Sequence, residues 1–210
     1  MSRILITSGP TRQYIDPVRY LTNASSGLMG KSLAEAALAA GHEVLIVSGP
    51  VNVAYPRAAQ VIDVVSTEDM LAACEEHFPD CDGLIDVAAP CDYRPRVVSD
   101  QKICKTGEPL VLHLIETTDV VATMGGSKRD DQWVVGFALE TDDHRFRAIT
   151  KLERKSCDLI VLNRPQAMHS DSNDVEVLNP AGEVVLAATG LKQDVSREIF
   201  GVIESHLLAE

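Results

Sequence analysis

The stretch Ile4–Lys31, ILITSGPTRQYIDPVRYLTNASSGLMGK, predicts the fold class of this chain. It begins as an apolar strand over residues 4–7, turns at Ser8-Gly9-Pro10 and enters a helix after Ser25-Ser26-Gly27. In a parallel sheet the strand ends open onto a ligand crevice, and unpaired amides at a helix start attract phosphate or carboxylate groups. The stretch therefore predicts an α/β fold with an anionic ligand near its first strand end.

The connection between this strand and helix is longer and more polar than an ordinary strand–helix loop. It carries Arg12, Asp16, Arg19 and Asn23, four groups able to bind or orient a ligand. Taken alone, Ser-Ser-Gly is more often a tight turn with a capped helix than a ligand site. The four polar groups in the same loop favour a binding site, although the GxGxxG dinucleotide fingerprint is absent.

Length and composition limit the possible classes. The 210 residues fit a single domain, residues 1–210, and 45% hydrophobic with 4% aromatic residues indicates the aliphatic core typical of parallel sheets. A net charge of −12 argues against general binding to nucleic acid or anionic membranes, because both need a basic face. The chain enters a core strand almost at once and has no apolar run of membrane-spanning length, so we expect no signal peptide and a cytoplasmic location.

The cysteines and histidines indicate neither metal binding nor covalent catalysis. The five cysteines are scattered and form no CxxC pair, which indicates reduced thiols. The six histidines show no metal-ligand spacing, and the sequence lacks HExxH, Gly-x-Ser-x-Gly and a Cys–His arrangement. The sequence therefore favours catalysis by positioning and charge stabilisation over catalysis by a nucleophile.

Strand and helix patterns alternate along the chain. The expected strands are 4–7, 43–47, 60–65, 83–88, 110–114, 133–138 and 158–162, and the expected helices are 27–40, 68–77 capped by Thr67, one from 117–119 onward, 144–157 and 196–208. Residues 175–178 and 183–186 flank a hairpin turn at 179–182, and the unpatterned residues 91–109 indicate a flap or arm. The pattern predicts a Rossmann-like, three-layer α/β/α fold with a mostly parallel sheet, a long arm and a C-terminal β-hairpin.

Two strand ends carry further candidate groups. Small side chains at Val87-Ala88-Ala89-Pro90 would let a ligand approach the backbone, and Asp92 follows, although a turn residue is an equally good reading of it. Phe137 could place a flat ring beside a base, but a ring filling the core is the simpler account.

Lysines are the other candidates. Lys151 and Lys155 share one helix face and could meet a triphosphate, although an ordinary charged helix surface is the more frequent case. Lys102 and Lys105 lie in the arm, where isolated lysines normally face water. Residue type and spacing thus lead to a nucleotide or phosphate ligand at a Rossmann-like switch point, and not to a reaction.

A family resemblance adds the reaction. The motifs ITSGPT, IDPVRYLTNASSGLMG, VSGP, AAPCDYRP, KICK, VGFALET and KLERKSCDLIVLN occur in the order seen in phosphopantothenoylcysteine synthetases, from Ile4 to about Asn163. The chain resembles the synthetase half of the bacterial coenzyme A biosynthesis bifunctional flavoprotein, here standing without the flavin-dependent decarboxylase half. The resemblance implies ligation of (R)-4′-phosphopantothenate to L-cysteine through an acyl-cytidylate, with CTP as co-substrate, Mg²⁺ as cofactor, no flavin, and CMP and pyrophosphate as products. The eukaryotic type uses ATP instead.

The resemblance also implies roles for residues at matching motif positions. Asn23 matches the asparagine that handles the acyl-cytidylate, Arg19 and Ala88 match positions tied to the same intermediate, and Lys102 matches the lysine that helps to form it. Nucleotide-contacting positions are matched by Asp92, Lys102, Thr118, Asp119, Val120, Val121, Phe137, Lys151 and Lys155; metal ligands are not identified.

Three positions depart from the family pattern. Pro90-Cys91 replaces a common Val-Ala. Cys104 replaces a lysine in KICK, which favours Lys102 over Lys105 as the functional lysine. Arg164-Pro165 replaces a small or acidic continuation.

The resemblance further implies a homodimer in which an arm crosses to the partner, with small-molecule substrates and no nucleic acid or membrane. A non-catalytic nucleotide-sensing module on the same fold is the alternative. A nicotinamide oxidoreductase ranks third, because both the glycine fingerprint and a Tyr-x-x-x-Lys pair are missing.

Overall fold

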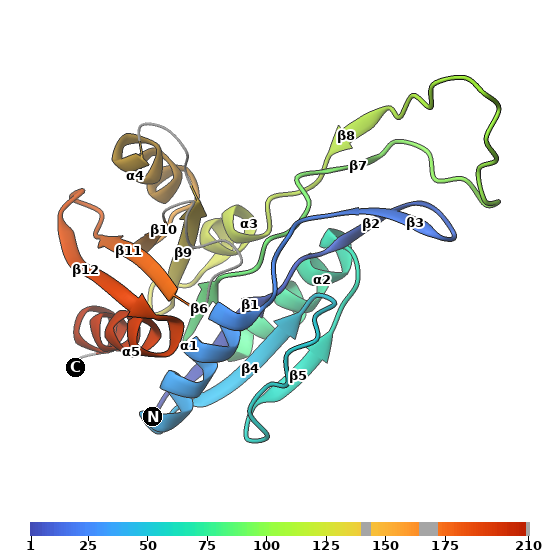
Figure 1. The fold of residues 1–210 in the computed structure, drawn as a ribbon. Coiled ribbons are helices and arrows are strands. Elements are labelled where there is room, and N and C mark those ends of the chain that lie inside the picture. Colours follow the sequence, from blue (N-terminus) through green and yellow to red (C-terminus); the bar gives the residue numbers. More distant parts are fainter. Residues whose placement is uncertain (140–143, 164–171, 209–210) are drawn as a thin grey trace.

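The computed structural model describes residues 1–139, 144–163 and 172–208. At its centre is an eight-stranded sheet in the order β12-β11-β10-β9-β6-β1-β4-β5 (Figure 1). Its strands are β1 (Arg3–Ser8), β4 (Glu43–Ser48), β5 (Gln60–Asp63), β6 (Gly83–Asp86), β9 (Trp133–Leu139), β10 (Leu159–Asn163), β11 (Ser172–Leu178) and β12 (Val184–Leu191). In this spatial order, every neighbouring pair of strands between β5 and β10 is parallel. β11 pairs antiparallel with both β10 and β12. The predicted mostly parallel sheet with a C-terminal hairpin is confirmed.

Helices cover both faces of this sheet. Successive residues of β1 point to opposite faces, so Ile4 and Ile6 join one apolar cluster and Leu5 joins the other. The first cluster includes side chains of α1 (Leu28–Ala39) and α5 (Lys192–Ile203); the second includes side chains of α2 (Thr67–His77), α3 (Val120–Ser127) and α4 (His144–Arg154). The predicted three-layer α/β/α fold is confirmed.

The topological switch of the sheet lies between β1 and β6. From β1 the chain builds β4 and β5 on one side, then returns to place β6 and β9 on the other side of β1. At such a point the loops leaving the carboxyl ends of neighbouring strands diverge to opposite faces and open a crevice. The ligand site is therefore expected where β1 and β6 end.

The polar loop predicted after the first strand contains an antiparallel hairpin of β2 (Arg12–Asp16) and β3 (Arg19–Thr22). A second antiparallel pair, β7 (Tyr93–Pro95) and β8 (Leu114–Glu116), lies at the base of the arm. Both pairs project from the body of the domain, and residues 96–113 form the outer part of the arm without helix or strand (Figure 1). The arm thus extends beyond the predicted 91–109, and the strand predicted at 110–114 begins only at Leu114.

Several predicted helix and strand ends are wrong by a few residues. Ser66, not Thr67, caps α2: its hydroxyl accepts from the Asp69 N–H at 3.0 Å while the Asp69 carboxylate accepts from the Ser66 N–H at 2.9 Å. α3 begins at Val120 and is capped by Asp119, in agreement with the predicted start at 117–119, and α5 begins at Lys192, before the predicted Ser196. Among smaller differences, α4 ends at residue 154, β5 at 63 and β6 at 86, while short helical turns Phe78–Asp80 and Glu204–Leu208 follow α2 and α5.

The start of α1 packs directly against the end of β1. A Cβ added to Gly30 would lie 2.2 Å from the Ser8 Oγ, so only glycine permits this approach. Gly27, the N-cap, has a φ of +77°, a left-handed conformation that favours glycine. The small residues predicted near the helix start therefore bring its amides to the strand end, although Met29 is buried there and Leu28 only half-buried.

None of the described helices combines the length and hydropathy needed to cross a lipid bilayer.

Candidate functional site

A two-lobed cleft lies at the carboxyl ends of the central strands. The first lobe, about 480 Å³, is bounded by the β3–α1 connection, the loop after β6 and the end of β9. The second lobe, about 560 Å³, is bounded by the loop after β6 and the start of α3. The two lobes share Asp86, Pro90, Asp92, Lys151 and Lys155. They therefore form one continuous site at the predicted switch point.

Asn23 fastens two walls of the first lobe together. Its side-chain amide donates to the Pro90 carbonyl at 2.8 Å and to the Ala89 carbonyl at 3.2 Å. These bonds join the connection before α1 to the loop after β6, two segments far apart in sequence. Asn23 thus lines the first lobe and holds the loop after β6 through its side-chain amide.

Ala88 is held by a chain of hydrogen bonds from β1. The Ala88 N–H donates to the Thr7 Oγ1 at 3.2 Å, and the Thr7 hydroxyl donates to the Asp86 Oδ1 at 2.7 Å. Burial raises the pKa of Asp86 to about 6, although the Thr7 hydrogen bond and the Lys155 charge oppose that rise. A buried carboxyl group therefore stands where the two lobes meet.

The second lobe surrounds the start of α3. Asp119 caps this helix by accepting from the Ala122 N–H at 3.1 Å, and its other oxygen lies 3.2 Å from the Lys155 Nζ. Thr118, Val120 and Val121 also line the lobe, and the two valines are buried. This arrangement combines helix-start amides with a lysine ammonium, which suits a phosphate group.

Phe137, Lys151 and Lys155 complete the predicted nucleotide positions. Phe137 is half-buried at the end of β9 and lines the first lobe. Lys151, in the last turn of α4, and Lys155, which directly follows that helix, line both lobes. Both lysines therefore lie in the cleft, beside the carboxylates of Asp86, Asp92 and Asp119.

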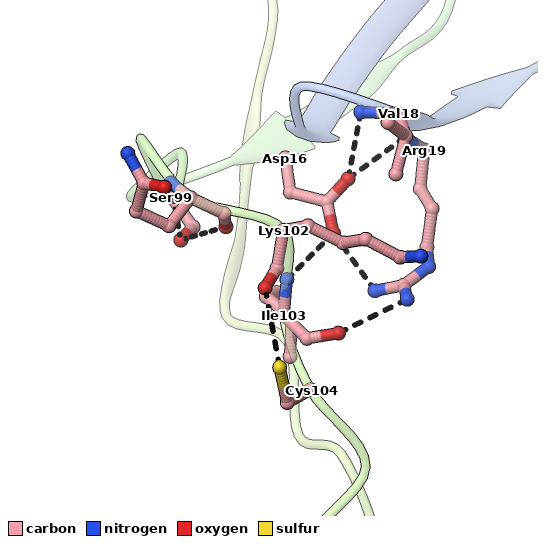
Figure 2. Close-up of polar contacts among 8 residues, drawn as sticks. Asp16, Val18, Arg19, Ser99, Lys102, Ile103 and Cys104 are labelled. Atoms are coloured by element: carbon pink, nitrogen blue, oxygen red, sulfur yellow. Dashed lines mark hydrogen bonds and ion pairs between the residues drawn. The ribbon is translucent and has the colours of Figure 1, made fainter.

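Two predicted catalytic residues lie elsewhere. Arg19 and Lys102 line neither lobe; they lie where the β2–β3 turn meets the arm (Figure 2). The Arg19 guanidinium contacts the Asp16 carboxylate at 2.8 Å and donates to the Ile103 carbonyl at 3.0 Å. Within one chain, the predicted residues therefore fall into two groups. One group lines the cleft, and the other is Arg19 and Lys102 at the junction of the β2–β3 turn with the arm.

The departures from the family pattern are accommodated in different ways. Cys91 is buried: its N–H donates to the Thr11 Oγ1 at 2.8 Å and its carbonyl accepts from the Thr117 hydroxyl at 2.6 Å. Burial also raises the pKa of the Cys91 thiol. Cys104 is exposed on the arm, and Arg164-Pro165 lies outside the described residues. All five cysteines are unpaired, as predicted.

Sequence reasoning missed several groups that line the cleft. Asp86 and Asn163 are polar final residues of apolar strands, a signal that could have identified them. Arg154, Asn173 and Lys192 gave no such signal, because helix α4 and the C-terminal elements reach the cleft only through folding. Asn173 donates to the Asn163 Oδ1 at 3.0 Å and so joins β11 to β10 at the rim of the first lobe.

Carboxylates that line the cleft are the side chains that could help to hold a metal ion. Within the described ranges no group of three or more His, Cys, Asp or Glu side chains could hold a metal ion. Mg²⁺ commonly keeps several waters and binds through substrate phosphates with one or two carboxylates. Asp92, which lines both lobes, could supply such a carboxylate.

Fold and site together define a Rossmann-like α/β domain with a two-lobed cleft at its switch point. Residues 1–207 match the family described as the DNA/pantothenate metabolism flavoprotein C-terminal domain. The chain therefore belongs to this family.

Known relatives agree with this assignment. The coenzyme A biosynthesis bifunctional protein CoaBC of Vibrio vulnificus (strain YJ016) is 39% identical over 208 residues, covering 96% of this chain and 52% of the relative. A crystal structure of the C-terminal domain of a CoaBC protein superposes with a TM-score of 0.85 at 39% identity, covering 99% of this chain and 96% of that one.

Another relative, from an unknown prokaryotic organism, carries the name cysteine/cysteine sulfinic acid decarboxylase. It is 46% identical over 162 residues, covering 77% of this chain and 45% of the relative. The chain thus spans about half the length of the curated relatives it matches, and that decarboxylase name is not transferred to it.

Proposed function

We propose that this chain is a phosphopantothenate–cysteine ligase of coenzyme A biosynthesis. The observation that carries the proposal is the cleft, in which the motif residues Asn23, Ala88, Asp92, Phe137 and Lys155 converge on two adjoining lobes. Two lobes suit a reaction that must hold a nucleotide and a second acidic substrate at the same time. The names of the CoaBC relatives support the same pathway.

The reaction requires activation of a carboxylate. The phosphopantothenate carboxylate attacks the α-phosphate of CTP, forming an acyl-cytidylate and releasing pyrophosphate; the cysteine amine then attacks the acyl carbon and CMP leaves. Negative charge develops on the phosphate in the first step, and Lys151 and Lys155 are placed to offset it. We propose that Mg²⁺ enters with CTP and neutralises further phosphate charge. Neither step transfers electrons, so we propose no flavin for this chain.

The amide of Asn23 suits the second step. A neutral amide can hold the acyl group without protonating the incoming amine, whereas a carboxylic acid could. Ala88 beside it has no bulk that would obstruct the acyl group, and its N–H is fixed by Thr7. We therefore assign Asn23 and Ala88 to the handling of the acyl-cytidylate.

We further propose a cytoplasmic homodimer in which the arm of one copy reaches the cleft of the other. The arm exposes a run of apolar side chains, including Val97 at 78% and Val111 at 71%. Exposed apolar patches of this kind mark protein–protein contacts. A second copy would supply Arg19 and Lys102 to a cleft that lacks them within its own chain.

A nucleotide-sensing module remains the second candidate. The placement of Arg19 and Lys102 outside both lobes favours it, because a cleft that lacks them could bind nucleotide without turnover. Turnover distinguishes the two candidates.

The test is a nucleotide panel with phosphopantothenate and cysteine in the presence of Mg²⁺. We expect release of CMP that depends on both acid and amine, with CTP preferred over ATP. Nucleotide binding without any nucleoside monophosphate release would support the sensing module and contradict the ligase. Release of AMP rather than CMP would correct the nucleotide only.

A further inference from the structure

We propose that Asp16 is a positioning residue that joins the β2–β3 turn to the arm and thereby presents Arg19 and Lys102 as one unit. The inference rests on the proposed ligase function, because it assigns Asp16 to the step that needs Lys102. Asp16 itself lines neither lobe of the cleft.

The Asp16 carboxylate makes four contacts. Its Oδ1 accepts from the backbone N–H groups of Val18 at 2.9 Å and Arg19 at 2.8 Å, which closes the hairpin turn. Its Oδ2 accepts from the Arg19 guanidinium at 2.8 Å and from the Ile103 N–H at 3.1 Å (Figure 2). One carboxylate therefore binds both the turn and a residue 87 positions away in sequence.

Arg19 completes the junction. It donates from its second terminal nitrogen to the Ile103 carbonyl at 3.0 Å, so both polar backbone atoms of Ile103 are engaged. A further bond, from the Ser99 N–H to the Ile15 carbonyl at 3.0 Å, fastens the same arm segment. Lys102 immediately precedes Ile103, and its backbone position is set by this junction.

Because Asp16 is buried, we assign it a role in positioning other residues and not in binding a ligand. The Asp16 side chain is 0% exposed, whereas that of Arg19 is 41% exposed and Lys102 is also exposed. A ligand can thus reach the two cations but not the carboxylate that holds them. Burial alone would raise the pKa of Asp16, yet three backbone N–H donors and Arg19 outweigh it and keep the pKa below its ordinary value. The junction therefore stays charged at neutral pH.

The junction matters because the outer arm has no regular structure of its own. Residues 96–113 form neither helix nor strand, so without fixed contacts Lys102 would sample many positions at an entropic cost on binding. Small displacements of a catalytic group can cost about 100-fold in rate. Asp16 is thus expected to affect the rate of acyl-cytidylate formation and not the affinity of the cleft.

The first experiment compares Asp16→Asn with Asp100→Asn, a control on an exposed carboxylate of the same arm. Asn keeps the size of Asp16 but cannot accept all four contacts. We expect pyrophosphate release with phosphopantothenate and CTP to fall by about 10- to 100-fold in Asp16→Asn. CTP affinity, measured by calorimetry, should stay close to that of Asp100→Asn. Wild-type pyrophosphate release in Asp16→Asn would overturn the proposal.

A double-mutant cycle separates positioning from general damage. If Asp16 acts through Lys102, then Asp16→Asn combined with Lys102→Gln should be little slower than Lys102→Gln alone. A strictly additive loss would show that Asp16 acts independently of Lys102 and would contradict the proposal. Ile103→Pro removes the N–H donated to Asp16 and also fixes φ at residue 103 and restricts the backbone of Lys102, so it should reproduce the loss even if Asp16→Asn folds poorly.

Hydrogen exchange tests the junction apart from the reaction. The Ile103 amide should exchange faster in Asp16→Asn than in Asp100→Asn, whereas amides of β1 should be unchanged. Unaltered exchange at Ile103 would refute the junction itself. A wild-type protein without turnover would contradict the proposed ligase, while an active wild type with a fully active Asp16→Asn would contradict only this inference.

Discussion

Several of the polar side chains in this protein act on the backbone at the cleft. Asn23 holds the Ala89 and Pro90 carbonyls, and Thr7 links the Ala88 N–H to Asp86. Each of these residues comes from a different strand end or connection. Each wall of the cleft is therefore held in place by hydrogen bonds from one or two side chains. Substituting these residues should change the shape of the cleft as well as the reaction it supports.

Asp86 gives a prediction on stability. Its folded pKa of about 6 lies above the value of about 3.9 for an unfolded aspartate, so ionisation opposes folding. The free energy of unfolding should therefore fall as pH rises from about 4 to about 6 and change little above that through this group. Asp86→Asn keeps an acceptor for Thr7 and never ionises; we expect it to be more stable than wild type by on the order of 2 kcal/mol at pH 7.5 and equal near pH 4.

Urea unfolding at the two pH values measures this difference. Asp100→Asn, an exposed carboxylate, serves as the control and should show no such pH-dependent gain. A gain in Asp86→Asn that is the same at both pH values would mean that packing, and not ionisation, accounts for it.

At the level of elements, the close packing of the start of α1 against the end of β1 brings the backbone amides of the helix start to the cleft. Gly30 lines the first lobe and faces Ser8 so closely that a Cβ would lie 2.2 Å from its Oγ and 2.6 Å from its Cβ. The helix can therefore approach the strand end only because this position has no side chain. Packing here outweighs the intrinsic cost of glycine within a helix.

Gly30→Ala tests the contact between these two elements. We expect a loss of about 1–3 kcal/mol in the free energy of unfolding, because α1 must shift away from Ser8. Gly201→Ala is the matched control: Gly201 lies within α5, and nothing would lie within 4 Å of its added Cβ. There the gain in helix propensity should stabilise the protein by about 0.5–1 kcal/mol. Equal stability of the two variants in chemical denaturation would contradict the predicted close packing.

At the scale of the whole molecule, the arm is the feature that a single chain leaves unexplained. It projects from the body of the domain (Figure 1). Val97, Val111 and neighbouring apolar side chains of the arm are exposed to water. The cleft carries the proposed nucleotide positions, whereas Arg19 and Lys102 lie where the β2–β3 turn meets the arm. A homodimer would bury the exposed apolar side chains of the arm. It would also bring Arg19 and Lys102 of one copy to the cleft of the other.

Charge substitution on the arm tests the dimer. We expect Val97→Glu and Val111→Glu to shift sedimentation equilibrium toward monomer, because the contact would bury a carboxylate in each copy. Val61→Glu, on the edge strand β5 and 38% exposed, should leave the association unchanged. The monomeric variants should still bind CTP but release little CMP. A wild-type monomer with full activity would contradict the dimer.

Local sequence patterns predicted the strands of the sheet and some of the residues that line the cleft. Apolar runs such as Leu159–Leu162 predicted buried strands, because periodicity and burial are local properties of a chain. The small residues around Gly27 and Gly30 predicted the helix start at the ligand crevice, and the ordered motifs predicted the family. Asn23, Asp92 and Lys155 were identified in this way and lie together in the cleft.

Tertiary structure alone decided how those elements meet. No local pattern could show that the Asp16 carboxylate would accept from the Ile103 N–H, or that Asp86 would be a buried carboxyl between two lobes, because both depend on segments far apart in sequence. The hairpin within the first loop and the true extent of the arm were missed for the same reason: each is held by pairing across strands and not by periodicity. Motif order identified Arg19 and Lys102, but only folding separated them from the cleft of their own chain.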